Sequence, residues 1–504
     1  MIYHITDNLS KAIPLADIPL VEYAALYHDL EQRLQDERYH VAHYFARLEE
    51  GQLRFYLILL DDKQHNILLS SHALDYYDEV TLPSLTALHP ALHPFEREIA
   101  ELFSVKFGSM PWLKPLRFSA DRLNRNSTID NYPFYHIEGE SLHQVNVGPI
   151  HAGIIEPGAF RFICNGESVL HLEIALGYQH RGLEREFSND SNRLRQTLLA
   201  ENIAGDSAVS HASAFALAIE KLTDFTPSEA LIIERHIAQE LERMAMHIAD
   251  TGALCMDVGY QLGQVACEAL RTMTINTTQA WCGNRFGKGL IRPMGTNKPL
   301  NSAKIDMIRQ NVAEIARRYE EVRQDIKTSP TLLARFEQCG NVGRAEMLRI
   351  GGVGMAARAS NAPRDIRLSH PYGLFGKELQ HESVIKRQGD VMARLMVRCR
   401  EVLQSAEYIQ QLLNLYSTAT ATQQPDYEAK LTPEALSLSL TEGWRGEICH
   451  VAITDKQGNI ATYKVKDPSL HNWLALALAV RSEGISDFPI CNKSFNLSYC
   501  GHDL

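Results

Sequence analysis

An acid and a His-Arg pair lie close together in this sequence and could take part in proton transfer. Glu156 precedes Pro157, which biases the acid toward an extended backbone, and the pair is His180 and Arg181. If Glu156 faces an enclosed cavity, desolvation raises its pKa, unless Arg161 or Arg181 pairs with it and lowers the pKa. An acid whose pKa lies near the working pH exchanges protons efficiently. The alternative is a structural acid whose hydrogen bonds are all satisfied.

A β-hairpin is predicted between these groups. Apolar and polar residues alternate over residues 160–164 and again over 169–174. Asn165-Gly166 lies between the two runs, and such a dipeptide is the strongest short-range signal for a hairpin turn. The predicted hairpin therefore carries Glu156 at its entrance and His180-Arg181 at its exit.

The cysteines predict no metal site of their own. None of the nine belongs to a Cys-x-x-Cys pair, so a zinc or iron–sulfur site built from close pairs has no support. Scattered single cysteines are more often small buried residues of a reduced, cytoplasmic protein. Histidines near the hairpin are also more often structural than metal ligands. They are His151, His171, His180 and His211.

The composition is that of a globular protein without a membrane span. At 504 residues the chain predicts more than one domain, and 45% hydrophobic with 22% charged residues is ordinary. The net charge of −11 disfavours nucleic acid or an anionic lipid surface as a direct partner. No apolar run approaches the roughly 20 residues that span a bilayer, and the first residues lack the layout of a signal peptide. If the protein works at a membrane, other subunits must hold it there.

The first part of the chain is predicted to be a small α/β domain over residues 1–118. Its apolar spacing predicts a helix over 21–36, a hairpin over 41–60 and a short acidic helix over 94–103. One interpretation of the last is an amphipathic helix whose charged face meets solvent. Residues 119–145 are polar and aromatic without a clear period, which is typical of a linker.

The larger part, residues 146–504, is predicted to be a helix bundle with β-hairpins, which makes the whole chain α+β. Apolar residues recur at alternating spacings of three and four over 305–326, and a second stripe covers 391–413. Such helices must cover one another's apolar faces, so a bundle forms the core. Further predicted elements are a helix over 189–221, an amphipathic helix over 229–250, strands over 448–454 and 460–465, a helix over 473–481 and an irregular tail over 488–504.

Three motifs around the predicted hairpin occur together and in order. They are Gly148-Pro149-Ile150-His151, Glu156-Pro157-Gly158 and Gly177-Tyr178-Gln179-His180-Arg181-Gly182. These residues resemble the opening motif of the large subunits of membrane-bound, energy-converting nickel–iron hydrogenases, including the formate hydrogenlyase type. They resemble, more distantly, the homologous 49 kDa-type subunit of respiratory complex I.

The acidic helix adds a second resemblance. Residues 95–103 look like the signature of the 30 kDa-type subunit of complex I, a module that is fused to the large subunit in formate hydrogenlyase. The resemblance therefore implies a docking domain over 1–118, a linker over 119–145 and a hydrogenase large-subunit-like domain over 146–504.

The resemblance also implies four cysteine ligands for a nickel–iron centre, and all four are missing. Alignment on His211 puts the first pair at Ala204 and Ser207, and alignment on Asp503 puts the second pair at Ser498 and Gly501. Because such a centre requires soft thiolates, we expect no nickel–iron centre and no cofactor in this chain. An iron–sulfur cluster is expected only in a partner subunit. With the sequence ending at Leu504, we expect no C-terminal extension to be cleaved.

In complex I the corresponding cavity holds a quinone through a His and a Tyr. The resemblance places these groups near Ala159 and at Gly205, so neither is present. The Asp that partners the His in complex I is matched by Asp257. The usual quinone contacts are therefore not expected here.

The resemblance makes four acids candidates for a proton relay. Glu156 matches the acid that passes protons in hydrogenases, Asp206 lies in the first ligand loop, and Asp503 lies in the last beside His502. Asp257 completes the set. For each of them a satisfied buried polar group is the alternative.

Two classes of function follow from the resemblance. The first is a peripheral-arm subunit of a complex I-like or hydrogenase-related oxidoreductase, which couples electron or proton transfer to ion translocation without a nickel–iron centre. Its partners would be a small iron–sulfur subunit and membrane ion-translocating subunits on the cytoplasmic side of the inner membrane. The second is a non-catalytic assembly or coupling subunit of an ion or inorganic-carbon transport complex. A quinone-site subunit of the NADH-quinone oxidoreductase type is a further alternative.

Overall fold

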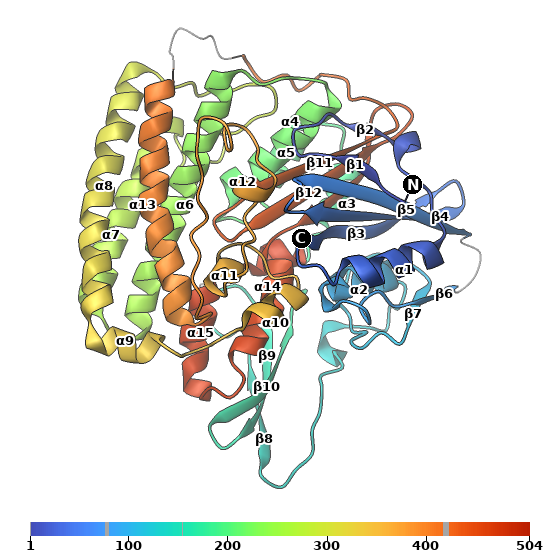
Figure 1. The fold of residues 1–504 in the computed structure, drawn as a ribbon, viewed down its shortest axis with the longest axis horizontal. Coiled ribbons are helices and arrows are strands. Elements are labelled where there is room, and N and C mark those ends of the chain that lie inside the picture. The colour runs from blue at the N-terminus through green and yellow to red at the C-terminus, as the bar shows by residue number, and fades with distance from the viewer. Residues whose placement is uncertain (1, 76–79, 154, 417–422) are drawn as a thin grey trace.

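The computed structural model describes residues 2–75, 80–153, 155–416 and 423–504. Four long helices stand side by side at one end of the molecule, and two four-stranded sheets lie toward the other end (Figure 1). A three-stranded sheet projects from the lower edge of this view. The mixed arrangement confirms the predicted α+β class. Among the described residues, no helix combines the length and the apolar character needed to cross a membrane.

The bundle consists of α6 (Glu229–Asp257), α7 (Gln261–Cys282), α8 (Ser302–Thr328) and α13 (Val391–Leu415). The two predicted apolar stripes lie on α8 and α13 and are buried, with Ile308, Ile315 and Leu395 fully enclosed. Burial of each large aliphatic side chain contributes about 1.5–3 kcal/mol. The sequence analysis missed α7, whose buried face is interrupted by threonines that donate back to their own helix.

The N-terminal region forms the antiparallel sheet β1-β5-β4-β3, as predicted for its central hairpin. At the β3–β4 turn, Glu50 and Gly51 have φ of 48° and 89°, the left-handed pair that fits the twist of a two-residue hairpin. The helices α1 and α2 match the predicted ones. The bounds are β1 (His4–Thr6), α1 (Tyr23–Arg33), β3 (Tyr39–Glu49), β4 (Gln52–Asp61), β5 (Asn66–Asp75), β6 (Val80–Pro83), α2 (His93–Leu102) and β7 (Val105–Gly108).

The charged face of α2 is buried, so the interpretation of this helix as one with a solvated charged face is wrong. Glu96 accepts hydrogen bonds from the Ser84 hydroxyl at 2.6 Å and from the Leu85 and Thr86 amides. Glu98 forms ion pairs with Arg117 and Lys464. The charges are therefore satisfied inside the protein rather than by water.

A second four-stranded sheet, β13-β12-β11-β2, joins the two ends of the chain. Its strands are β2 (Ile13–Pro14), β11 (Ala435–Glu442), β12 (Glu447–Thr454) and β13 (Ile460–Lys466), and β11 was not predicted. The Asn8 amide donates to the backbone carbonyls of His370 and Leu440 at 3.0 and 2.9 Å, and His40 bonds Glu447 at 2.8 Å. The N-terminal region is therefore held to the rest of the chain by buried polar contacts.

The hairpin is confirmed as β9 (Ala159–Asn165) and β10 (Ser168–Ala175), and β8 (Leu142–Val147) pairs with β9. The last residues of the predicted linker thus form a strand. The tail after residue 488 is also not irregular. It forms α15 (Phe488–Phe495) and α16 (Tyr499–Asp503), separated by Asn496 at φ 45° and packed against the hairpin through Phe488.

The single helix predicted over 189–221 is wrong. The chain forms α3 (Leu183–Asn189), α4 (Arg193–Ala200) and α5 (Ala208–Leu222) instead. The Asn192 side chain accepts from the Arg195 amide at 3.0 Å and so begins a new helix. The second break, over residues 201–207, contains the first ligand loop.

The other elements are short. They are η1 (Leu15–Asp17), η2 (Pro90–Leu92), η3 (Ile129–Asn131), α9 (Pro330–Phe336), α10 (Arg344–Arg349), α11 (Gly354–Ala359), α12 (Ile366–Ser369), α14 (Ser469–Ala479) and η4 (Ile485–Asp487). The predicted helix over 473–481 corresponds to α14, which begins earlier than expected.

Candidate functional site

Arg445 connects the two segments that contain the positions of the missing cysteine ligands, 204 and 207 in one and 498 and 501 in the other. Its guanidinium donates to both oxygens of Asp206, at 2.7 Å each, and to the carbonyl of Asn496 at 2.5 Å. Asp206 lies between the first two ligand positions, and Asn496 closely precedes the segment that holds the last two. Arg445 itself comes from the turn between β11 and β12. The site is therefore formed by three segments that are far apart in the sequence and that Arg445 holds together.

The Asp206–Arg445 pair is rigid and strongly charged. The Arg445 guanidinium lies 3.9 Å from the centre of the Trp444 ring, and the Trp444 indole donates to the Asp206 carbonyl at 2.9 Å. Burial opposes the charge of Arg445, but the Asp206 carboxylate outweighs it and raises the pKa of Arg445. The site thus holds a permanent cation beside the loop of the first ligand pair.

A carboxylate occupies the space that a side chain at position 501 would need. A Cβ added to Gly501 would lie 2.7 Å from Asp467 Cγ and 2.9 Å from Ser498 Oγ. Asp467 is fixed by His211, whose Nε2 lies 3.0 Å from Asp467 Oδ2. Burial alone would favour the protonated acid, but His211 and Arg445 hold the pKa of Asp467 below its usual value.

These residues do not fit a nickel–iron centre. The four ligand positions are Ala204, Ser207, Ser498 and Gly501, none of which carries sulfur, and all four are buried. The Cys500 sulfur lies 3.4 Å from Ser498 Oγ. Within the described ranges, no three His, Cys, Asp or Glu side chains are grouped so as to hold a metal ion.

Glu156 lies beside Cys500, at the entrance of the hairpin. The Cys500 amide donates to Glu156 Oε2 at 3.2 Å. Burial and the charge of Glu156 raise the pKa of the Cys500 thiol to about 11, with a smaller contribution from Asp206. The two arginines that were considered as partners bond elsewhere: Arg161 stacks on Phe134, and Arg181 donates to backbone carbonyls.

Asp503 anchors the exit of the hairpin. Its two carboxylate oxygens accept from the amides of Gly177 and Gln179 at 2.8 and 2.9 Å, and His502 Nδ1 lies 2.8 Å from Oδ1. The Asp503 carbonyl lies 2.7 Å from His180 Nδ1. These contacts position the turn that begins at Gly177, where φ is 100°.

Asp257 lies apart from the other three candidates. It is the last residue of α6 and is exposed. Nearby protein atoms partly desolvate its carboxylate and raise its pKa, and Lys493 opposes this shift. In the part of the chain that the structure describes, no hydrogen bond or ion pair joins Asp257 to the other candidates. The structure therefore groups Glu156 with Asp206 around Cys500 and leaves Asp257 outside.

A buried ionic network that the sequence analysis missed leads away from this site into the bundle. Asn496 donates to Asp250 at 2.6 Å, and Asp250 pairs with Arg398 at 3.1 Å. His247 lies 3.4 Å from Arg398 and 2.8 Å from Glu401. The network runs in order through Asp206, Arg445, Asn496, Asp250, Arg398, His247, Glu401, Arg358 and Glu442.

The far end of this network holds an acid that titrates near neutrality. Arg358 contacts both Glu401 and Glu442, at 2.8 and 2.7 Å. Burial, reinforced by the charge of Asp365, raises the pKa of Glu442 to about 7. The charged residues of α6 were expected on a polar face, but Glu240 and Arg243 are buried and pair with each other. Charged residues alternate with apolar ones along α6, and this pattern fits buried ion pairs as well as a solvated face. The sequence pattern therefore did not identify this network.

Comparisons with known proteins agree with this architecture. The profile of the family described as respiratory-chain NADH dehydrogenase, 49 Kd subunit, matches residues 257–503. Hydrogenase-4 component G of Escherichia coli (strain K12) is 25% identical over 478 residues, covering 91% of this chain and 80% of the relative. Formate hydrogenlyase subunit 5 of the same organism is 26% identical, covering 83% and 76%.

A third relative is named as part of an oxidoreductase. The C/D subunit of the NADH-quinone oxidoreductase of Phocaeicola vulgatus is 23% identical over 454 residues, covering 83% of this chain and 85% of the relative. The similarity to these proteins thus extends well beyond the family domain. Residues 257–503 are a domain of the 49 kDa subunit family of respiratory-chain NADH dehydrogenase, in a chain similar over most of its length to hydrogenase and NADH-quinone oxidoreductase subunits.

Proposed function

We propose that this chain is a peripheral subunit of a membrane-associated complex related to complex I and to hydrogenases, and that it couples proton transfer or a conformational change to ion translocation without a nickel–iron centre. The proposal rests on the side chains that lie around the four positions of the missing metal ligands. These side chains are ionic: Arg445 is bonded to Asp206, and Asp467 lies where a side chain at position 501 would point. The names of the relatives, which are components or subunits of hydrogenases and an oxidoreductase, support the assignment to a complex.

Proton transfer is the chemistry that these side chains can perform. Glu156 lies at the cavity beside Cys500, and the ionic network begins at Asp206. At its other end Glu442, with a pKa of about 7, can gain or lose a proton under ordinary conditions. Because each charge is paired, a proton added to an acid at one end weakens its ion pair and so changes the strength of the neighbouring ion pair. The network offers a route for proton or conformational coupling.

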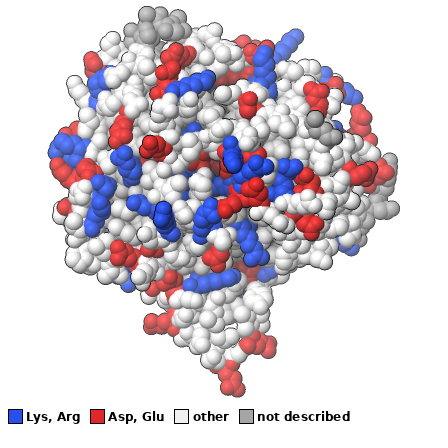
Figure 2. All heavy atoms as spheres, in the orientation of Figure 1, with Lys and Arg blue, Asp and Glu red and all other residues white. Residues whose placement is uncertain are grey.

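Partner binding is supported by the projecting sheet. Exposed apolar side chains gather in and beside β8, β9 and β10, and Ile150 is 85% exposed. The others are Tyr135, Ile155 and Leu170. On the face shown in Figure 2, this projection carries few charges, and those near its tip are acidic. We assign this surface to the small iron–sulfur subunit, and membrane ion-translocating subunits would hold the complex on the cytoplasmic side of the inner membrane.

A redox role at the same cavity is the second candidate. A Cβ at Gly205, where the resemblance to complex I places a quinone-binding Tyr, meets no atom within 4 Å, so there is open space at this point. A small substrate or quinone could approach here through contacts that differ from the usual His and Tyr. The frame of motifs from Glu156 to Asp503 would then serve an oxidoreductase.

Isolation of the intact complex through a tag on this chain tests both candidates. Nickel, iron and acid-labile sulfide are measured per chain, and the copurifying subunits are identified. The coupling proposal expects membrane subunits, no nickel and no reduction of added quinone. Stoichiometric nickel or the absence of any copurifying membrane subunit would overturn it. Iron–sulfur signals that respond to added quinone would favour the redox candidate instead.

A further inference from the structure

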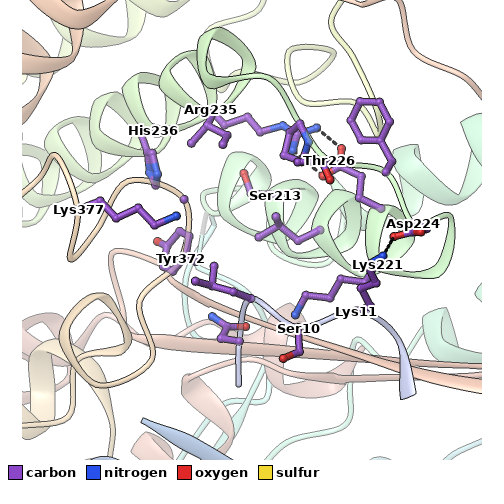
Figure 3. Close-up of a pocket in the computed structure, with 18 of the residues that line it drawn as sticks. Ser10, Lys11, Ser213, Lys221, Asp224, Thr226, Arg235, His236, Tyr372 and Lys377 are labelled. Carbon is purple, nitrogen blue, oxygen red and sulfur yellow. Dashed lines mark hydrogen bonds and ion pairs between the residues drawn. The ribbon is translucent and has the colours of Figure 1, made fainter. Parts of the chain in front are cut away.

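A cavity of about 320 Å³ lies away from the ligand positions. It is enclosed by residues 8–11, by α5 and α6, and by the loop over 372–377 (Figure 3). Ser213, Arg235 and His236 come from the two helices, while Tyr372 and Lys377 reach toward the same space from the loop. Its volume lies at the lower end of the range for small-molecule sites, roughly 300–1,000 Å³.

Four of the residues that line it each contain a buried polar side-chain atom with no hydrogen-bond partner within the described part of the chain. These atoms are Ser213 Oγ, Arg235 Nε, His236 Nδ1 and Gln239 Nε2. The four residues are at most 6% exposed. An unpaired buried polar atom costs free energy, and most such atoms in folded proteins have partners. Four such atoms on residues that line one cavity point to a ligand that pairs with them, although the side chains of His236 and Gln239 also interact with each other.

All four atoms can donate a hydrogen bond. His236 Nε2 accepts from the Leu374 amide at 3.1 Å, so in the neutral ring Nδ1 carries the proton. Burial lowers the pKa of His236 to about 4, which keeps the ring neutral at ordinary pH. The other nitrogens of Arg235 are used by Glu220 and by the Arg292 carbonyl, so Nε alone remains.

The acidic side chains around the cavity are already paired, and cations outnumber acids. Glu220 is paired with Arg235, and Asp224 is paired with Lys11 at 2.6 Å. Lys221 and Lys377 also line the cavity. A lining rich in donors and positive charge, in a chain of net charge −11, complements an anion whose oxygens accept hydrogen bonds. Apolar side chains complete the walls: Leu9, Leu217, Phe225, Pro227 and Ile232.

We propose that this cavity binds a small organic monocarboxylate. Its carboxylate oxygens accept from Ser213, Arg235, His236 and Gln239, and its short apolar body packs against the aliphatic and aromatic walls. The site does not depend on the proposed coupling function, because none of the ligand positions or relay candidates lines it.

Calorimetric titration of the purified full chain with acetate, butyrate and hexanoate tests the proposal, with butyramide as the uncharged match for butyrate. We expect saturable binding of at least one carboxylate and at least about tenfold weaker binding of butyramide, since hydrogen bonds to a charged group are the stronger ones. No saturable binding of any of the three carboxylates, or equal binding of butyramide, would overturn the proposal.

Two variants test whether the ligand binds in this cavity. Ser213→Ala and Gln239→Leu each remove an unpaired donor, so each should weaken carboxylate binding about tenfold. Ser213→Ala should also leave the unliganded melting temperature unchanged or raised, whereas Gln239→Leu also removes the acceptor of the Tyr372 hydroxyl. Ser70→Ala is the matched control, because its hydroxyl is equally buried and unpaired but lies on β5. Weakening by Ser70→Ala to the same extent, or unchanged affinity in both cavity variants, would show that the ligand binds elsewhere.

Discussion

Asp206 and Arg445 are 239 positions apart in the chain and meet in a two-pronged ion pair, with each carboxylate oxygen 2.7 Å from its own guanidinium nitrogen. Arg445 also bonds the carbonyl of Asn496, ahead of the last ligand positions. The pair therefore joins the two loops that thiolates and a metal would join in the hydrogenases that this chain resembles. Ionic contacts thus supply a structural link at this place.

The first prediction concerns the stability that this pair supplies. Asp206→Asn keeps the shape but removes the carboxylate that is hydrogen-bonded to the buried guanidinium of Arg445, so the free energy of unfolding should fall by about 1–3 kcal/mol. Urea unfolding measures the change. Asp121→Asn is the control, because both Asp121 oxygens accept from a single nitrogen of Arg185 at the surface, where ion pairs contribute about 0–1 kcal/mol. Equal losses in both variants would contradict the argument.

The second prediction concerns the last ligand position. A methyl group at residue 501 would lie 2.7 Å from the Asp467 carboxylate, so Gly501→Ala should destabilise the protein by about 1–3 kcal/mol. Gly205→Ala places a methyl group where nothing lies within 4 Å and should leave the melting temperature nearly unchanged. Differential scanning calorimetry compares the two. A Gly501→Ala protein as stable as the Gly205→Ala protein would mean that Asp467 moves aside freely.

The third prediction uses Cys500 as a reporter of the charge on Glu156. Cys500 is only partly buried, whereas the other cysteines are buried. Because burial and the Glu156 charge raise the thiol pKa to about 11, Glu156→Gln should lower that pKa and speed alkylation by iodoacetamide about two- to tenfold at a fixed pH near 9.

Mass spectrometry of the Cys500 peptide follows the alkylation. Glu138→Gln, at a side chain that is 92% exposed, is the control and should leave the rate unchanged. In the assembled complex, Glu156→Gln should abolish proton-coupled activity while assembly and melting temperature stay nearly the same. An unchanged alkylation rate would show that Glu156 does not act on the thiol, and full activity would leave Glu156 a structural role only.

The fourth prediction is a pH dependence. Burial raises the pKa of Glu242 from 4.5 to about 7, although it accepts hydrogen bonds from Ser210 and the Val209 amide. The folded protein therefore binds the proton more tightly, and the contribution of Glu242 to stability is present below pH 4.5 and is lost as the pH rises to about 7. Relative to wild type, Glu242→Gln should gain as much as about 3 kcal/mol over this range.

Glu240, on the same helix, supplies the control with the opposite sign. Burial favours its neutral form, but Arg243 and Arg367 outweigh burial and lower its pKa. Its stabilising contribution is present above the unfolded pKa and is lost as the pH falls, so Glu240→Gln should be most destabilising at neutral pH. Chemical denaturation between about pH 3 and 7.5 measures both slopes, that of Glu240 below about pH 5 and that of Glu242 above it. Slopes of the same sign in the two variants would contradict the assignment.

Local patterns in the sequence were enough to predict much of the scaffold. The hairpin around Asn165-Gly166 and the helices α8 and α13 depend on turn chemistry and on apolar periods within a few residues of one another. The absence of thiolates at Ala204, Ser207, Ser498 and Gly501 is likewise a property of the sequence alone. These features needed no knowledge of which distant segments meet.

Tertiary structure decided which polar groups pair. Glu240 and Arg243 have the spacing of a solvated helix face, yet they are buried, because partners from α13 and from the turn after β11 surround α6. The same holds for Asp257, which the sequence grouped with Glu156 and which the fold leaves exposed. An ion pair is made by whichever opposite charge the fold brings within a few ångströms, and a periodic pattern contains no information about that partner.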